Sequence, residues 1–252
     1  MPDGASVVVT SASRGPWDLR GWGRVVDQTF FPPICPACRA RVCEVGEDLC
    51  GGCAADLVEV SGLRCSGCGD PNDTILARCG ECLAGPRRPW DHAVTAFAYG
   101  GLVRRLLQRF KYDGATCLAP LFGRRMAEAW AQHGLPDVAA IVPVPMPALR
   151  EFRRGYNQAA LLATVIGRRL DLPVRNILRR RHRVRRQATL DRQGRQRNVR
   201  DVFAVKRNAK RLDSPILVVD DILTTGATLE AAVKALRAAM PASVSILTLA
   251  RG

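Results

Sequence analysis

Residues 216–228, ILVVDDILTTGAT, place two carboxylates and several hydroxyls directly after an apolar run. The run from Ile216 to Val219 is rich in β-branched residues, which is typical of a buried parallel strand. The polar residues that follow it are Asp220, Asp221, Thr224, Thr225, Gly226, Ala227 and Thr228, where Gly226 and Ala227 contribute backbone N–H groups. Paired carboxylates accept hydrogen bonds from a vicinal diol, and backbone N–H groups at the start of a helix bind phosphate. The segment therefore predicts a sugar-phosphate site.

The order of residue types narrows this prediction. An apolar strand, two acids, two variable residues and Thr-Thr-Gly-x-Thr together resemble the loop of type I phosphoribosyltransferases that binds 5-phosphoribosyl-1-diphosphate (PRPP). A paired aspartate could instead form the magnesium site of a receiver-like domain, and a Gly/Thr turn could simply connect a strand to a helix. Neither alternative requires the Thr-Thr-Gly-x-Thr that follows the two acids. A P-loop is excluded here because the segment has no Gly-Lys-Ser/Thr.

Eight of the ten cysteines form four Cys-x-x-Cys pairs. The pairs are Cys35/Cys38, Cys50/Cys53, Cys65/Cys68 and Cys79/Cys82. Stretches of eleven, eleven and ten residues separate successive pairs, as in zinc ribbons, where two such knuckles complete one tetrahedral site. We expect two Zn²⁺ ions, with the pairs combined in chain order or in a nested arrangement. Buried free thiols, redox-active pairs or an iron–sulfur cluster are the alternatives, and Cys43 and Cys117 match no pair.

The zinc sites are expected to be structural and to define a small domain. Four thiolates leave no open coordination position for a catalytic water. The segment also has few large apolar residues, so it cannot form a core without the metal. We place a double zinc ribbon at residues 30–86, a phosphoribosyltransferase-like domain at residues 90–252, and disorder at residues 1–18, which show no periodicity.

Strand-like and helix-like segments alternate after residue 90. Strands are expected at residues 93–99, 139–144, 174–178, 202–205, 216–219 and 243–249. Helices are expected at residues 102–110, 118–132, 157–170 and 229–239. This alternation predicts an α/β fold with a parallel sheet flanked by helices, in which ligands bind beyond the carboxyl ends of the strands.

Positive charge is concentrated in one region. Residues 150–211 contain 20 Lys or Arg and 4 Asp or Glu, whereas the whole chain has a net charge of +15. Clustered arginines favour a polyanionic partner, either a diphosphate or nucleic acid. The run at residues 179–200 has no aromatic residue for stacking on bases, which weakens a pure nucleic-acid interpretation. A solvated loop is the alternative.

The sequence contains no apolar stretch close to the ~20 residues that cross a bilayer. Its first residues also lack a charged start followed by a long apolar segment. We therefore expect no membrane span and a cytoplasmic location.

Several motifs in order resemble the ComF family, ComFC type, in which a double zinc ribbon precedes a type I phosphoribosyltransferase-like domain. The resemblance covers residues from about Phe30 to Arg251. Its motifs are FPPICPAC, the later Cys-x-x-Cys pairs, FKYDG, VPVP, RRGYNQA, the spaced Gln187, Leu190, Arg195, Asn198 and Val199, VVDDILTTGAT and LTLAR.

The resemblance implies roles for particular residues. VPVP would end the strand before the diphosphate-binding loop, with Arg153, Arg154, Asn157 and Gln158 close to it. The segment from Arg179 to Asn198 would close over PRPP and exclude water. Lys111 is a further candidate for the diphosphate, and Mg²⁺ would bridge the ribose hydroxyls and the diphosphate.

Two functional hypotheses from different classes follow. The first is a Mg²⁺-dependent enzyme that transfers a phosphoribosyl group to an unknown acceptor. Purine-salvage relatives carry an acid before the Thr-Gly of the loop, whereas this chain has Thr224 and Thr225, so purine salvage is disfavoured and no catalytic base is identified. The second hypothesis is a PRPP or nucleotide sensor that binds single-stranded DNA during natural competence. The acceptor and the oligomeric state are not readable from the sequence.

Overall fold

The computed structural model describes residues 34–40, 42, 48–60, 62–72, 77–133, 137–181, 202–207, 209, 213–239 and 241–252. The disorder expected at residues 1–18 and the predicted closing loop from residue 182 onward lie outside the described residues. The chain divides into two compact units, Met1–Gly51 and Gly52–Gly252, and each is described by itself.

The described part of the first unit is built around a cysteine turn. The Arg39 N–H donates to the Cys35 carbonyl, and the Cys35 N–H donates to the Ala40 carbonyl, both at 2.8 Å. Arg39 takes a positive φ of 65° to close this turn. The short helix α2 (Gly51–Ala55) starts at the last residue of this unit.

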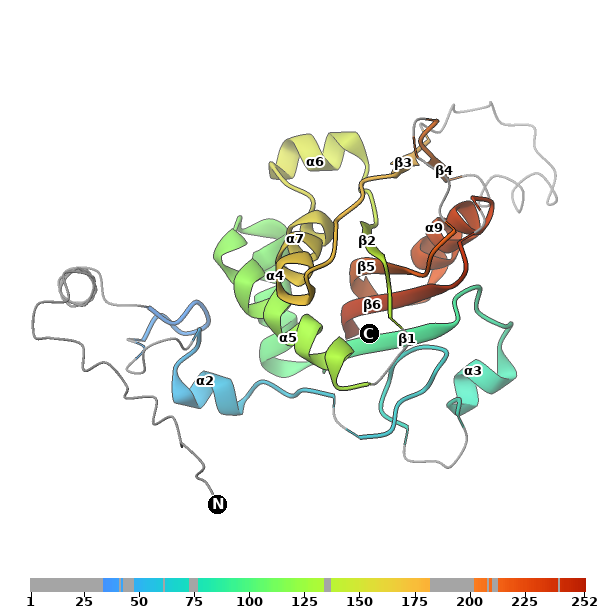
Figure 1. Cartoon of the computed structure of the whole chain (residues 1–252). Coiled ribbons are helices and arrows are strands. Elements are labelled where there is room, and N and C mark those ends of the chain that lie inside the picture. The colour runs from blue at the N-terminus through green and yellow to red at the C-terminus, as the bar shows by residue number, and fades with distance from the viewer. Residues whose placement is uncertain are drawn as a thin grey trace, which may run out of the picture. The chain divides into compact units, whose positions relative to one another are not determined.

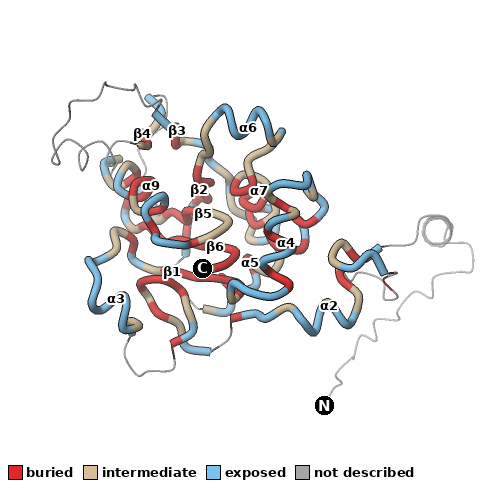
Figure 2. Tube along the Cα trace, turned by 180° about the vertical axis from the view of Figure 1, so that it is seen from behind, coloured by how far each residue is buried: buried red, intermediate tan, exposed pale blue. Residues whose placement is uncertain are grey.

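A four-stranded parallel sheet forms the centre of the second unit (Figure 1). Its strands are β1 (His92–Ala98), β6 (Val244–Arg251), β5 (Ile216–Leu223) and β2 (Ala140–Pro143), in that spatial order. In the middle of the sheet, Val218 on β5 pairs with Ile246 on β6 and with Val142 on β2. These strands are almost continuously buried (Figure 2), as expected for a parallel sheet covered on both faces.

Helices cover the two faces of the sheet. α4 (Gly101–Tyr112), α5 (Ala119–Ala131) and α7 (Gln158–Leu170) lie on one side, and α9 (Ala227–Arg237) lies on the other (Figures 1 and 2). A 3-10 turn at Thr116–Leu118 precedes α5. Alternate strand residues, such as Ile216 and Val218, pack with Leu229 and Val233 of α9 in one apolar cluster. No helix of the described residues is both long enough and apolar enough to span a membrane.

The expected strands at residues 174–178 and 202–205 do not extend this sheet. β3 (Leu178–Arg180) and β4 (Phe203–Val205) form a separate two-stranded antiparallel sheet. Val174 makes only one bridge, to Ile141. The sequence prediction also missed α6 (Ala148–Arg154), which is too short and too exposed to show an apolar period.

The second cysteine cluster belongs to the core of this unit. Cys65, Cys68 and Cys82 are buried in the same apolar cluster as Trp90 and Ala93. The Trp90 indole donates to the Gly67 carbonyl at 2.8 Å. Gly69 has a φ of +75°, and a Cβ there would lie 2.8 Å from the Thr95 nitrogen. The cysteine turn therefore packs directly on β1, together with the short helix α3 (Gly80–Ala84).

Candidate functional site

β5 continues through the paired acids instead of ending before them. The strand runs to Leu223, and Asp220 pairs in register with Thr248 of β6. Both acids are largely but not completely buried, because they lie near the carboxyl edge of the sheet. The prediction ended the strand at Val219, because two adjacent acidic residues are not typical of a buried strand.

The hydroxyl-rich turn leads into α9 earlier than expected. The helix begins at Ala227, and its N-terminal cap is Gly226 with a φ of +82°. The Glu230 N–H donates to the Gly226 carbonyl at 2.8 Å, and the Ala227 N–H donates to the Thr225 hydroxyl at 3.4 Å. A left-handed residue at this point is the role for which glycine is suited.

Arg88 supports this turn from outside the motif. Its guanidinium donates to the Thr225 carbonyl at 2.9 Å and forms an ion pair with Glu230. A Cβ at Gly226 would lie 2.5 Å from Arg88 Nη1. No periodicity or motif marks Arg88, which lies in a proline-flanked connection far from the turn in the chain.

The two acids differ in their surroundings. Burial and, to a smaller extent, the Asp221 charge together raise the pKa of Asp220 to about 8, against the opposing effects of the Asp221 N–H and Lys111. The Asp221 N–H donates to Asp220 Oδ1 at 2.9 Å. Lys111 Nζ lies 3.0 Å from Asp221 Oδ2. Near neutral pH, Asp220 and Asp221 together therefore carry less negative charge than two free carboxylates would.

A cavity of about 260 Å³ joins these acids to basic side chains. We call it the acid cavity. Asp220, Asp221, Thr224 and Thr228 line it from β5, the turn before α9 and the first turn of α9, and Lys111 comes from α4. The other polar lining residues are Tyr112, Arg150, Arg154, Asn157, Gln158 and Arg180. The arrangement brings hydrogen-bond acceptors and cationic donors into one cavity, which suits a polyol that carries several phosphates.

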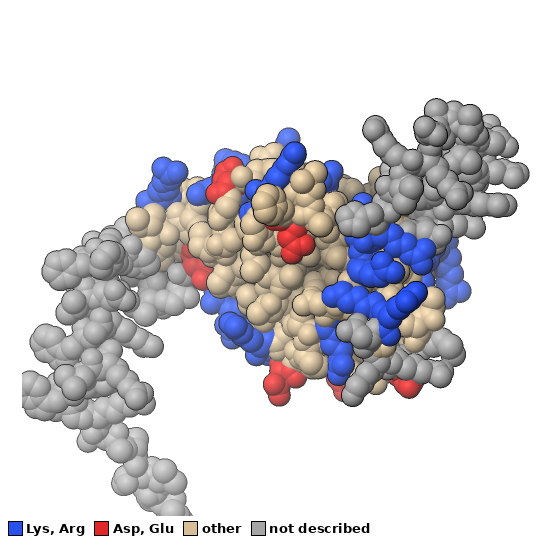
Figure 3. Space-filling model, turned by 90° about the horizontal axis from the view of Figure 1, so that it is seen from above, with Lys and Arg blue, Asp and Glu red and all other residues tan. Residues whose placement is uncertain are grey.

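Four of the expected site residues do not line the acid cavity. Arg153 lies on the exposed surface of α6, and Thr225, Gly226 and Ala227 form the turn beside the cavity. Seen from above, Lys and Arg side chains gather on one part of the surface (Figure 3).

Asn157 and Gln158 hold the turn that follows β2. The Asn157 side chain donates to the Val144 carbonyl at 3.1 Å and accepts from the Ala159 N–H at 3.0 Å, which caps α7. Buried Gln158 donates to the Phe110 carbonyl at 3.4 Å, and the Tyr156 hydroxyl donates to the same carbonyl. These bonds fix the proline-rich turn against α4 and α7.

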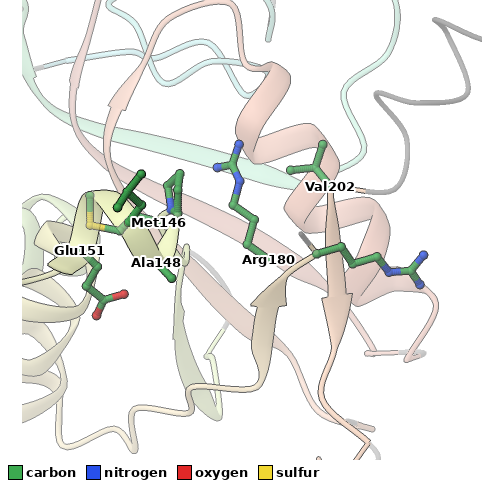
Figure 4. Close-up of a pocket in the computed structure, with 8 residues that line it drawn as sticks. Met146, Ala148, Glu151, Arg180 and Val202 are labelled. Carbon is green, nitrogen blue, oxygen red and sulfur yellow. The ribbon is translucent and has the colours of Figure 1, made fainter. Parts of the chain in front are cut away.

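A second cavity, of about 480 Å³, opens between α6 and the β3–β4 sheet. Arg180 extends toward it from β3, whereas Met146, Ala148 and Glu151 line it from the side of α6 (Figure 4). Met146 and Arg180 also line the acid cavity. The predicted closing segment is attached to these two short strands.

The cysteines form two groups of four in chain order, not a nested arrangement. They are Cys35, Cys38, Cys50 and Cys53 in one group and Cys65, Cys68, Cys79 and Cys82 in the other, with the ligand atoms of each group within 4.8 Å of one another. The Sγ atoms of Cys38 and Cys50 are 3.5 Å apart, and those of Cys68 and Cys79 are 3.7 Å apart. Zn–S bonds of about 2.3 Å in a tetrahedron require sulfur separations of this size. The donor sets fit two structural Zn²⁺ sites.

Two known domain families match parts of the chain. Residues 26–83 match the double zinc ribbon domain, and residues 138–252 match the phosphoribosyl transferase domain. With the parallel sheet described above, these matches give a type I phosphoribosyltransferase-like fold with an N-terminal double zinc ribbon.

Three curated relatives illustrate the similarity. Competence protein F of Haemophilus influenzae is 34% identical over 69% of this chain and 78% of its own length. The DNA utilization protein YhgH of Escherichia coli K12 is 31% identical over 60% of this chain and 67% of its own length. Competence protein ComFC of Bacillus subtilis is 26% identical over 71% of this chain and 74% of its own length.

Proposed function

The chain belongs to the ComF family of competence protein F, and we propose that it binds PRPP with Mg²⁺ in the acid cavity and transfers the phosphoribosyl group to an acceptor. The observation that carries this proposal is the position of Asp220 and Asp221 directly before the turn that begins α9. In this position, the acids accept from the ribose 2′ and 3′ hydroxyls, and the N–H groups of the turn bind the 5-phosphate.

The basic side chains of the acid cavity suit the diphosphate. Arg150, Arg154 and Arg180 line the cavity together with Lys111, which lies beside Asp221, and guanidinium groups bind phosphate oxygens in a bidentate manner. Carboxylate oxygens of Asp220 and Asp221 are the hard ligands that Mg²⁺ accepts directly or through water. When bound, Mg²⁺ neutralises charge on the leaving diphosphate.

The chain's own residues would favour the departure of diphosphate. The anomeric carbon develops positive charge as its bond to the diphosphate lengthens, and the two carboxylates are positioned on the ribose side to stabilise that charge. Water must be kept from this carbon, because hydrolysis would compete with transfer. Thr224 and Thr225 occupy the place where purine-salvage enzymes have an acid, so purine salvage remains disfavoured.

Calorimetric titration with PRPP and MgCl₂ tests the binding step. We expect one site per chain, and we expect at least tenfold weaker binding in Asp220→Asn/Asp221→Asn. Asp137→Asn, an exposed acid before β2, is the matched control and should bind normally. Absence of binding by the wild-type chain would overturn the proposal. Binding without diphosphate release for any acceptor would leave a sensor instead of an enzyme.

We further propose that the cytoplasmic steps of DNA uptake or use depend on this site. The names of the relatives, competence protein F and DNA utilization protein, motivate this role, and thiolate zinc sites suit a reducing compartment. Transformation frequency should fall in the Asp220→Asn/Asp221→Asn strain if the source organism is competent. An unchanged transformation frequency in such an organism would mean that DNA uptake does not depend on PRPP binding.

A second candidate function is binding of single-stranded DNA, and the surface around α6 favours it. Phe152 is 86% exposed and Tyr112 is 74% exposed. The Arg154 guanidinium lies 5.3 Å from the centre of the Tyr112 ring, and Arg150 and Arg153 are on the same short helix. Exposed aromatic rings among arginines form the usual combination of stacking platform and phosphate contacts.

Fluorescence anisotropy with a labelled oligothymidylate tests this candidate. Stacking contributes about 1–3 kcal/mol per base, so Phe152→Ala should weaken binding by roughly 5- to 160-fold. Leu149→Ala, which removes another exposed apolar side chain of α6, should have little effect. Binding that does not weaken between low and high salt would count against a phosphate contact surface.

A further inference from the structure

A third cavity lies where the turn before α9 meets the second group of cysteines. It has no part in the binding of PRPP proposed above. It is open to solvent and measures about 820 Å³. Its polar lining includes Asp70, Glu81, Thr224, Thr225 and Arg251. We call it the zinc-side cavity. We propose that it binds the acceptor of the phosphoribosyl group, and that this acceptor is a neutral or cationic compound with an amino nitrogen.

The position of the zinc-side cavity relative to the sheet supports this assignment. β5, which carries the acids, has β2 on one side and β6 on the other. The acid cavity is reached from β2 through Val144 and Pro145, whereas the zinc-side cavity is reached from β6 through Arg251 and Gly252. Thr224 lines both cavities. A ribose held at Asp220 and Asp221 would therefore face its diphosphate on one side and the zinc-side cavity on the other.

The chemistry of substitution requires such an arrangement. The attacking atom approaches the anomeric carbon from the side opposite the leaving group. The acceptor nitrogen donates its lone pair to form the new C–N bond, and the C–O bond to the diphosphate breaks, so that the diphosphate leaves with its electron pair. The nitrogen loses one proton after the C–N bond has formed, and this proton passes to the solvent at the open mouth of the cavity. No oxidant, reductant or further reactant is needed.

The charges around the zinc-side cavity define the class of acceptor. Arg251 is engaged by the protein itself: its guanidinium donates to Cys68 Sγ at 3.1 Å and forms ion pairs with Asp70 and Glu81. Its side chain is only 15% exposed, whereas the Glu81 side chain is 79% exposed. A ligand therefore meets carboxylate and hydroxyl oxygens before it meets the cation. A Zn²⁺ ion held by four thiolates adds a net charge of −2 next to this wall. An anionic acceptor is disfavoured, and a compound with an amino group, whose two N–H donors can reach two acceptor oxygens at once, is favoured.

Gly80 allows the zinc-side cavity to be filled without disturbing the fold. A Cβ at Gly80 would have nothing within 4 Å, and the same is true of Gly51. Gly80 follows the zinc ligand Cys79 at the start of α3, just as Gly51 follows Cys50 at the start of α2. Gly80→Leu places a side chain in the zinc-side cavity, and Gly51→Leu is its matched control.

This inference rests on the proposed function, and the experiment distinguishes the two. We would measure PRPP affinity by calorimetry, zinc content, and diphosphate release with adenine, cytosine or ethanolamine, using uracil and orotate as acceptors without an amino group. We expect release with at least one amino compound and not with the last two. Gly80→Leu should lower that release at least tenfold, while zinc content stays at two and PRPP affinity changes less than twofold; Gly51→Leu should match the wild type.

A conservative variant adds a second readout. Glu81→Gln keeps the shape of the side chain and removes its charge, so it should raise the KM for the amino acceptor severalfold and leave PRPP affinity unchanged. Three results would each overturn the acceptor assignment. They are a preference for orotate in diphosphate release, diphosphate release that Gly80→Leu does not lower, and PRPP binding without diphosphate release for any amino compound. A failure of PRPP to bind would instead overturn the proposed function.

Discussion

Lys111 Nζ and Asp221 Oδ2 lie 3.0 Å apart, although they come from α4 and β5 on distant parts of the chain. Both side chains are mostly buried, with 20% and 13% exposed. The pair places a cation against the second of two adjacent acids. Lys111 therefore forms an ion pair within the protein itself. The sequence predicted a different contact for Lys111, with the diphosphate of PRPP.

Removal of this cation should weaken the site. In Lys111→Met, Asp221 would lose its ion-pair partner, and the two acids would repel each other more strongly. We expect PRPP affinity to fall by about tenfold, which corresponds to about 1.4 kcal/mol. Lys234→Met removes an exposed lysine that pairs with Glu230 on α9, and calorimetry should show no loss of affinity for this control. Equal affinities in the two variants would exclude a role for Lys111.

The raised pKa of Asp220 predicts a particular pH dependence of stability. The folded chain binds a proton at Asp220 up to about pH 8, whereas the unfolded chain releases it near pH 4. The folded state therefore binds more protons between these values, and its stability falls as the pH rises from about 4 to 8. Thermal unfolding without ligand or Mg²⁺ should show this decline in the wild type relative to Asp220→Asn.

Asp221→Asn provides the complementary measurement. The Asp221 charge contributes to the raised pKa of Asp220, so its removal should shift the end of the decline to a lower pH. A decline that ends at the same pH in this variant would mean that burial alone sets the pKa of Asp220.

Gly226→Ala should distort the turn that we propose to bind the 5-phosphate. The residue has a φ of +82°, and the new Cβ would meet the Arg88 guanidinium. The backbone strain costs about 1 kcal/mol, and displacement of Arg88 would add the loss of its bonds to Thr225 and Glu230. Gly114→Ala is the control, because Gly114 has a φ of +69° but open space around its Cα. Gly226→Ala should unfold at a lower temperature than Gly114→Ala and bind PRPP more weakly.

The sequence predicted which residues lie together in the acid cavity better than it predicted the boundaries of the elements. The continuous apolar run before Asp220 is a strong signal because β5 is buried on both faces. The strand continues past Val219, however, because backbone pairing with β6 stabilises residues 220–223 in spite of the two charged side chains. Local residue types carry no information about such pairing.

Other parts of the site depend on contacts that the sequence does not encode locally. Arg88 reaches the turn across a long separation in the chain, and no motif marks it. α6 is short and has no buried residue, so it lacks the apolar period on which helix prediction depends. The cysteine spacing fixed the number of zinc sites but not their pairing, which depended on how the turns fold in space.

Loss of the two zinc sites should have different consequences, because only the second cluster contributes to the core that contains Trp90. Cys65 is fully buried in that core, whereas Cys38 is exposed. In Cys65→Ser, both the metal and the packing around Trp90 and Ala93 would be disturbed. A loss of about 4 kcal/mol would lower the Tm of a domain of this size by roughly 8–16 °C. Cys38→Ser should also lose one zinc ion per chain but leave the main transition and PRPP affinity close to those of the wild type. Metal analysis and tryptophan fluorescence during thermal unfolding would measure both effects, and equal loss of Tm in the two variants would contradict the separate roles of the clusters.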